Sequence, residues 1–110
     1  MIKRFSPICA FALLSGLAVT LPAAAWDAGV ERGRTFARTN CAGCHAVERV
    51  GSSPHDEAPA FRELHKRYDV DDLGEAFAEG ITTGHPGMPE FKFDTAQITD
   101  LLAFMKSLER

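Results

Sequence analysis

An all-α protein with long loops is predicted for this chain, on three observations. Apolar residues recur at helical spacing within residues 27–39, 69–80 and 94–108. No segment alternates apolar and polar residues at the period of two that marks a half-buried strand. Glycine, proline and serine gather between the helical segments, and there is no internal repeat. We therefore expect three to four helices joined by ordered loops.

The first 25 residues have the pattern of a secretory signal peptide. Two basic residues precede an apolar run at 8–19, and residues 23–25 are alanines, which suit cleavage by a signal peptidase. An uncleaved membrane anchor is the alternative, because the apolar stretch almost reaches the roughly 20 residues of a bilayer span. We expect residues 1–25 to be the leader and residues 26–110 to form one domain in the periplasm.

The composition limits the classes of partner. Loss of Lys3 and Arg4 with the leader lowers the 12 basic residues by two against 15 acidic ones, so the net charge falls from −3 to about −5. Nucleic acid is therefore excluded as an expected partner. A mature domain this small has a thin apolar core and commonly depends on a disulfide, a metal or a cofactor. Cys9 leaves with the leader, so only Cys41 and Cys44 remain.

The first expected helix covers residues 27–39. Its apolar side holds Val30, Gly33, Phe36 and Ala37. Its polar side holds Glu31, Arg32, Arg34 and Arg38. Asn40 ends this helix, and residues 48–59, rich in glycine, serine and proline, are expected to form a loop.

Three more helical segments follow. Residues 61–67 are expected to form a short helix, and the next helix begins with a capping sequence at Asp69 and ends at Gly80. Its apolar stripe is Val70, Leu73, Phe77 and Ile81. Residues 81–94 are expected to be an ordered loop. The last helix is capped by Asp94 and Gln97, and its stripe is Ile98, Leu101, Leu102, Met105 and Leu108.

Residues 41–45 form a Cys-x-x-Cys-His motif, Cys41-Ala42-Gly43-Cys44-His45. Two thiols at this spacing can add to the two vinyl groups of a haem, and the histidine is carried beneath the iron. Structural zinc would need two more ligands at local spacing, which the separated histidines do not offer. A dithiol redox centre would need a βαβ setting. The motif therefore favours one covalent c-type haem per chain over both alternatives.

Met88 is the candidate for the sixth iron ligand. Its thioether is a soft donor, Pro89 disfavours helical geometry at Met88, and Gly84 and Gly87 permit tight turns around it. His85 is the competing ligand, and bis-histidine coordination would lower the reduction potential. The default interpretation of a single methionine, core filling, is the third possibility.

In the order of these motifs, the chain resembles the small bacterial class I c-type cytochromes, which carry one haem. The resemblance covers about residues 28–108. It rests on the Cys-x-x-Cys-His motif, on residues 58–61 (Ala-Pro-Ala-Phe), on residues 87–91 (Gly-Met-Pro-Glu-Phe) and on the terminal helix at 102–108. It implies a cytochrome c fold, with helices and long loops wrapped around one covalent haem c.

The resemblance also implies a role for each residue of the site. Cys41 and Cys44 would form the thioethers, and His45 and Met88 would be the axial iron ligands. The Pro59 carbonyl would accept a hydrogen bond from the His45 ring, and Phe61 would pack on the haem face. Gly33 and Phe36 would meet Phe104 where the first and last helices cross. Candidates for binding the haem propionates are Arg49, Arg62, Tyr68 and Lys92.

These features predict a one-electron carrier of the periplasm and not an enzyme. A haem with two protein ligands leaves no position for a small-molecule substrate, so the expected partners are redox proteins: membrane oxidoreductases or periplasmic enzymes. The few lysines and the acidic charge indicate partners with a basic face, and we expect a monomer. The alternatives are a dedicated haem subunit of an oxidoreductase, and a haem enzyme or sensor with a displaceable sixth ligand.

Overall fold

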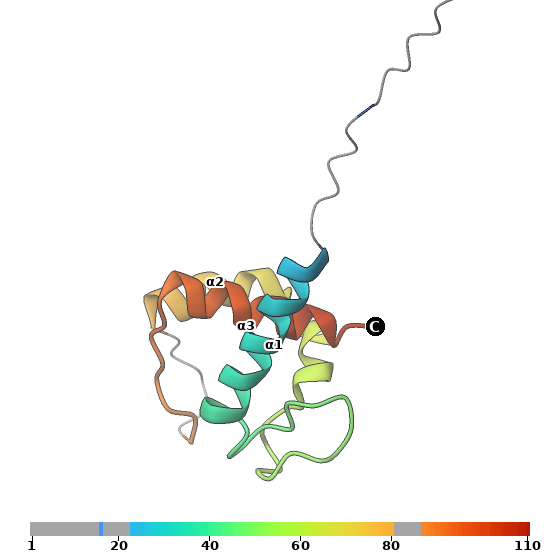
Figure 1. The fold of residues 1–110 in the computed structure, drawn as a ribbon. Coiled ribbons are helices and arrows are strands. Elements are labelled where there is room, and N and C mark those ends of the chain that lie inside the picture. Colours follow the sequence, from blue (N-terminus) through green and yellow to red (C-terminus); the bar gives the residue numbers. More distant parts are fainter. Residues whose placement is uncertain (1–15, 17–22, 81–86) are drawn as a thin grey trace, which may run out of the picture.

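The computed structural model describes residue 16 and residues 23–80 and 87–110. Four helices form there: α1 (Ala23–Asn40), the 3-10 helix η1 (Phe61–Lys66), α2 (Val70–Glu79) and α3 (Thr95–Ser107) (Figure 1). No β-strand occurs in these ranges, which confirms the all-α class. Most of the expected leader, together with Ile81, Gly84 and His85, lies outside the described residues. None of the described helices is both long and apolar enough to cross a bilayer.

Helix α1 begins earlier than the apolar periodicity indicated. It starts at Ala23, so the three alanines expected at the cleavage point lie in its first turn. Alanine is the strongest helix former, and the run 23–25 extends the helix in the N-terminal direction. The expected apolar side is confirmed where the structure describes it: Gly33 and Ala37 are buried, and Val30 and Phe36 are half-buried.

Helices α1 and α3 cross at Gly33. A Cβ atom at this position would lie 2.6 Å from the carbonyl carbon of Asp100 and 2.8 Å from Cβ of Phe104. Only glycine lets the two backbones approach this closely, so the expected contact between Gly33 and Phe104 is confirmed. The Phe36 ring, expected at the same contact, packs edge-on against Phe93, with 4.8 Å between the ring centroids.

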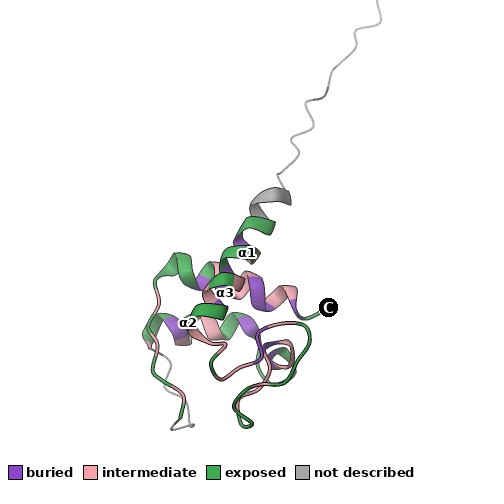
Figure 2. Cartoon of the chain, turned by 60° about the horizontal axis from the view of Figure 1, so that its bottom comes forward, coloured by how far each residue is buried: buried purple, intermediate pink, exposed green. Residues whose placement is uncertain are grey.

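The core lies between α1, α2, η1 and α3, and the buried residues line the inner sides of these helices (Figure 2). The stripe expected on α3 is confirmed, because Ile98, Leu101, Met105 and Leu108 are buried. Leu102 is half-buried and faces α2, where a Cβ atom on Gly74 would lie 2.9 Å from Cδ1 of Leu102. The sequence-based interpretation of Met105 as a core residue is also confirmed.

The residues expected to cap and end α2 and α3 do so in the structure. Asp94 and Gln97 form a reciprocal capping box, with N–H to O distances of 2.8 Å and 3.1 Å. Asp69 caps α2 by accepting a hydrogen bond from the backbone N–H of Asp71. Gly80 follows α2 with a φ of +97°, a conformation that favours glycine.

Candidate functional site

The Cys-x-x-Cys-His motif lies in a turn that continues from α1. The carbonyl of Ala37 accepts hydrogen bonds from the backbone N–H groups of Cys41 and Ala42, at 2.8 Å and 3.1 Å. The carbonyl of Cys41 accepts in turn from Cys44 and His45, at 3.2 Å and 2.9 Å. Both cysteines are half-buried and not joined to each other. Backbone hydrogen bonds therefore hold both thiols and the imidazole in one short turn.

The His45 ring lies between a backbone acceptor and an aromatic side chain. Its Nδ1 atom lies 2.7 Å from the carbonyl oxygen of Pro59. Because a carbonyl only accepts, Nδ1 must carry the proton, and the lone pair is left on Nε2. The ring of Phe61 lies beside the imidazole, with 5.3 Å between centroids. The structure thus brings His45, Pro59 and Phe61 together, although they are 14 and 16 residues apart.

The loop between His45 and η1 is held by hydrogen bonds that no spacing rule indicated. The backbone N–H of Phe61 donates to the carbonyl of Ala46 at 2.9 Å. The N–H of Ala46 donates to the hydroxyl of Ser53 at 3.0 Å. The N–H of His55 donates to the carbonyl of Cys44 at 3.1 Å. These bonds fold residues 46–61 back onto the motif and keep the Pro59 carbonyl opposite the imidazole.

An ion-pair cluster fastens the same loop to α1. Glu48 accepts hydrogen bonds from Nε of Arg34 at 3.0 Å and from Nε of Arg38 at 2.7 Å. The hydrogen bond from Arg34, with the contribution of Arg38, lowers the pKa of the Glu48 carboxyl below its ordinary value. Both arginines were expected on the polar face of the helix, but their partner Glu48 was not predicted, because the pairing depends on how the loop folds back onto α1.

The thiols and their surroundings fit thioether formation better than a metal-thiolate site. Burial raises the pKa of the Cys41 thiol to about 11, so burial there disfavours the thiolate that zinc requires. A thioether sulfur is uncharged and carries no such penalty. Among the described residues, no three histidine, cysteine, aspartate or glutamate side chains gather at a possible metal site. The chemistry of this donor set therefore fits a covalent haem, and Nε2 of His45 would be available to bind its iron.

Met88 lies in a bend of the segment that leads to α3. It is half-buried, whereas its neighbours Gly87 and Pro89 are exposed. The expected ordered loop without helix is confirmed for residues 87–93, and it is tied to the core by Phe91 and Phe93. His85, the competing ligand, lies outside the described residues, and the assignment of Met88 as a ligand stays a prediction.

Two of the four candidates for propionate binding hold backbone carbonyls. Arg49 donates to the carbonyl of Ser107 at 2.5 Å, at the end of α3. Arg62 donates to the carbonyls of Glu48 and Gly51, at 3.3 Å and 2.8 Å. Tyr68 and Lys92 are exposed. The structure therefore assigns the two arginines to loop and helix contacts, and the propionate partners stay open.

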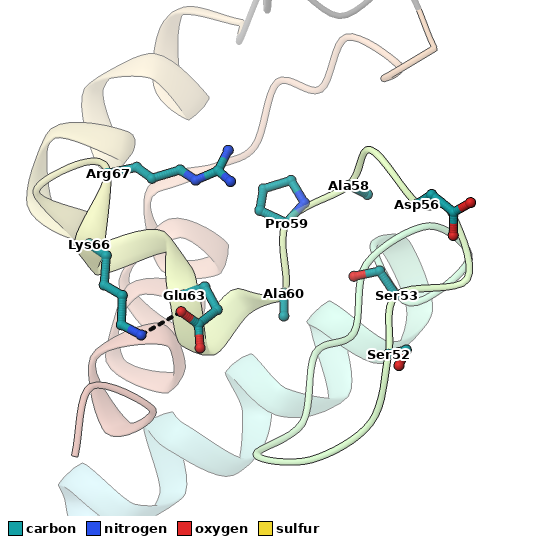
Figure 3. A pocket seen from close by; sticks show the side chains of 9 residues that line it. All are labelled: Ser52, Ser53, Asp56, Ala58, Pro59, Ala60, Glu63, Lys66 and Arg67. Atoms are coloured by element: carbon teal, nitrogen blue, oxygen red, sulfur yellow. Dashed lines mark ion pairs between the residues drawn. The ribbon is translucent and has the colours of Figure 1, made fainter.

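Two surface hollows flank the motif. The larger, of about 520 Å³, is lined by polar and charged residues next to Pro59, and the Arg67 side chain extends across it toward that proline (Figure 3). Neither cysteine nor His45 lines this hollow. The smaller, of about 280 Å³, includes His45 and Ala42 in its wall. Of the two, only the smaller hollow reaches the residues that carry the chemistry.

Comparison with known families gives one result. The sequence model of the family described as "Cytochrome c" matches residues 30–109, which is most of the chain. Members of this family bind covalently attached haem c, and Cys41 and Cys44 stand in the motif for that attachment. Neither a curated protein nor a solved structure matches the chain significantly.

Proposed function

The chain belongs to the cytochrome c family, and from this we propose that it is a periplasmic one-electron carrier with His45 and Met88 as the axial ligands of its haem. A haem-based role in electron transfer is common to the family. When bound, the haem supplies a ferric–ferrous couple that takes up and releases one electron. The observation that carries the proposal is the 2.7 Å contact between Nδ1 of His45 and the Pro59 carbonyl.

The proximal side of the haem would be built from residues that the protein's own hydrogen bonds and ring contacts orient. Cys41 and Cys44 would attach the haem from one turn, which places it against His45. The Pro59 carbonyl accepts a hydrogen bond from Nδ1–H, which fixes the orientation of the imidazole and would make Nε2 a stronger donor to iron. Phe61 shields the ring from one side.

Met88 supplies the property that separates a carrier from an enzyme. A thioether ligand favours ferrous iron and raises the reduction potential relative to a second imidazole. If His45 and Met88 both bind the iron, no iron position would be left for a substrate or a gas. The half-buried side chain of Met88 and its position next to Pro89 support this role.

The distribution of charge supports partners with a basic face. The arginines of α1 are paired with acids, as in Arg32 with Asp100 at 2.7 Å. Helix α2, in contrast, has no basic residue of its own. Asp71 pairs with Lys106 of α3, and the other carboxylates of α2 are exposed to solvent: Asp72, Glu75 and Glu79. Redox proteins of the periplasm or its membrane are the partners we propose, on the basis of this charge and of the leader-like pattern at residues 1–25.

Absorption spectra of the exported protein test the proposal. We expect the haem to stay with the chain through denaturing extraction, and the ferric protein to show the weak red band of methionine bound to iron. Met88→Ala should remove this band, and Met88→His should lower the reduction potential. Met105→Leu is the matched control, because Met105 is a buried core residue whose loss should leave the band intact. A red band that survives in Met88→Ala would refute the ligand assignment.

A further inference from the structure

The segment that carries Met88 contacts the core through aromatic rings and a backbone hydrogen bond. Between Gly87 and Asp94, every second or third side chain is shielded from solvent: Met88, Phe91 and Phe93 are half-buried, and the others are exposed. The segment contains no helix, and Phe91 forms an isolated β-bridge. The contacts of these three side chains therefore help to set its position relative to the helices.

Phe93 takes part in three aromatic contacts. Its ring centroid lies 4.8 Å from that of Phe36 in α1, 5.3 Å from that of Phe77 in α2 and 5.3 Å from that of Phe91. The pair with Phe36 is edge-on, with 82° between the ring planes, a favourable geometry for two aromatic rings. The backbone N–H of Phe93 also donates to the carbonyl of Phe77 at 3.1 Å.

Phe36, the residue of α1 that packs against Phe93, lies close to the Cys-x-x-Cys-His motif. Phe36 stands one residue before Ala37, whose carbonyl accepts the hydrogen bonds of Cys41 and Ala42. Phe36 itself accepts a hydrogen bond at its carbonyl from the side chain of Asn40, at 2.9 Å. The Phe36–Phe93 contact thus joins the helix end that leads into the motif to the segment that leads back to Met88.

Only four residues separate Met88 from Phe93. Pro89 fixes one backbone angle among them, and Phe91 stacks on Phe93 with 21° between the ring planes. A displacement of the Phe93 ring would therefore also displace Met88.

We propose that Phe93 is a positioning residue for Met88: its ring, placed against Phe36 and Phe77, sets the distance between the methionine segment and the helix end that carries Cys41 and His45. The inference rests on the proposed His45 and Met88 ligation and adds the residue that maintains it. Phe93 does not touch the iron in this assignment, so its effect is on how often the methionine is displaced.

The test measures displacement of the methionine directly. Imidazole added to the ferric protein binds iron only when Met88 has left, so its apparent affinity reports the displaced fraction. We expect Phe93→Ala to raise that affinity about tenfold or more, because the displaced state gains population when the ring contacts are lost. The pH at which the red band disappears should fall in the same variant.

Val70→Ala is the control for a loss of core volume elsewhere. Val70 is 2% exposed and lies two helical turns before Phe77 on α2. Its replacement should lower the free energy of unfolding and change the imidazole affinity by less than about twofold, since the displaced fraction depends on local contacts. Should Phe93→Ala not accumulate as folded protein, Phe93→Leu keeps an apolar side chain and should give a smaller increase, about threefold, by the same relation.

The outcomes separate the two proposals. An imidazole affinity in the Phe93 variants that changes no more than in Val70→Ala overturns the positioning role alone. A wild-type ferric spectrum without the red band overturns the Met88 assignment, and the role of Phe93 with it. A wild-type band together with a raised affinity in the Phe93 variants supports both.

Discussion

Replacing Gly33 with alanine perturbs the crossing of α1 and α3 at its closest point. The added Cβ would lie 2.6 Å from the carbonyl carbon of Asp100 and closer still to its oxygen, whereas ordinary contacts of this kind begin near 3.4 Å. The obstructing atoms belong to the backbone of α3 and cannot turn aside as a side chain could. The two helices would have to separate locally by about 1 Å, a substantial distance in a close-packed interior.

The expected cost follows from two opposing effects. Overpacking of this kind destabilises proteins by about 1–3 kcal/mol. Alanine is a better helix former than glycine by about 1 kcal/mol, which offsets part of the loss. We therefore expect Gly33→Ala to lower the free energy of unfolding by up to about 2 kcal/mol, or the melting temperature by up to roughly 15 °C for a domain of this size.

Gly29 provides a matched control one turn earlier on the same helix. Its added Cβ would lie 3.3 Å from Oδ1 of Asp100, a side-chain atom that can shift by a few tenths of an ångström. Gly29→Ala should be neutral or stabilising by up to about 1 kcal/mol, because it has the same helix-propensity gain without the backbone clash. Denaturant unfolding of the two holoproteins gives the comparison. Equal stability of the two variants would refute the close crossing.

Two further changes probe contacts of the loop and of α3. Glu48→Gln should cost at most about 1 kcal/mol near pH 7, because the carboxylate is partly exposed. Arg34 and Arg38 lower the pKa of the Glu48 carboxyl. The stabilisation from these ion pairs is therefore complete above the ordinary pKa of 4.5 and is lost as the pH falls through the lowered pKa. A difference in stability between wild type and Glu48→Gln that persists in acid would contradict the pairing. Asp94→Ala should cost about 1 kcal/mol by removing the helix cap. Asp94→Asn, which keeps an acceptor oxygen, should stay near wild type in the same denaturant assay, and equal losses would argue against the cap.

Local patterns accounted for most of the helices. The apolar stripe of α3 and its capping residues Asp94 and Gln97 lie within a few residues of one another, so spacing alone was sufficient to predict them. The start of α1 was wrong by four residues because an alanine run suits a cleavage site as well as a helix. The contact of Gly33 with Phe104 came from the family resemblance, since nothing in the spacing pairs residues so far apart.

In the candidate site, too, the local features were predictable from the sequence and the long-range contacts were not. Cys41, Cys44 and His45 are contiguous, so their placement in one turn was predictable. The approach of Pro59 to His45 depends on how a 14-residue loop returns, and only the resemblance indicated it. The pairing of Glu48 with two arginines and the contacts of Phe93 depend on tertiary packing, for which a single sequence carries no spacing signal.

The crossing of α1 and α3 joins residues as far apart as Arg32 and Asp100, which are 68 positions distant. A chain made from its N-terminus cannot form this crossing until its last helix has been synthesised. At about 5–20 residues per second, the stretch from Cys44 to the end of α3 takes roughly 3–12 seconds. Throughout that interval the two thiols belong to an incomplete fold. The order of synthesis therefore produces the attachment residues first and the helix that completes the crossing with α1 last.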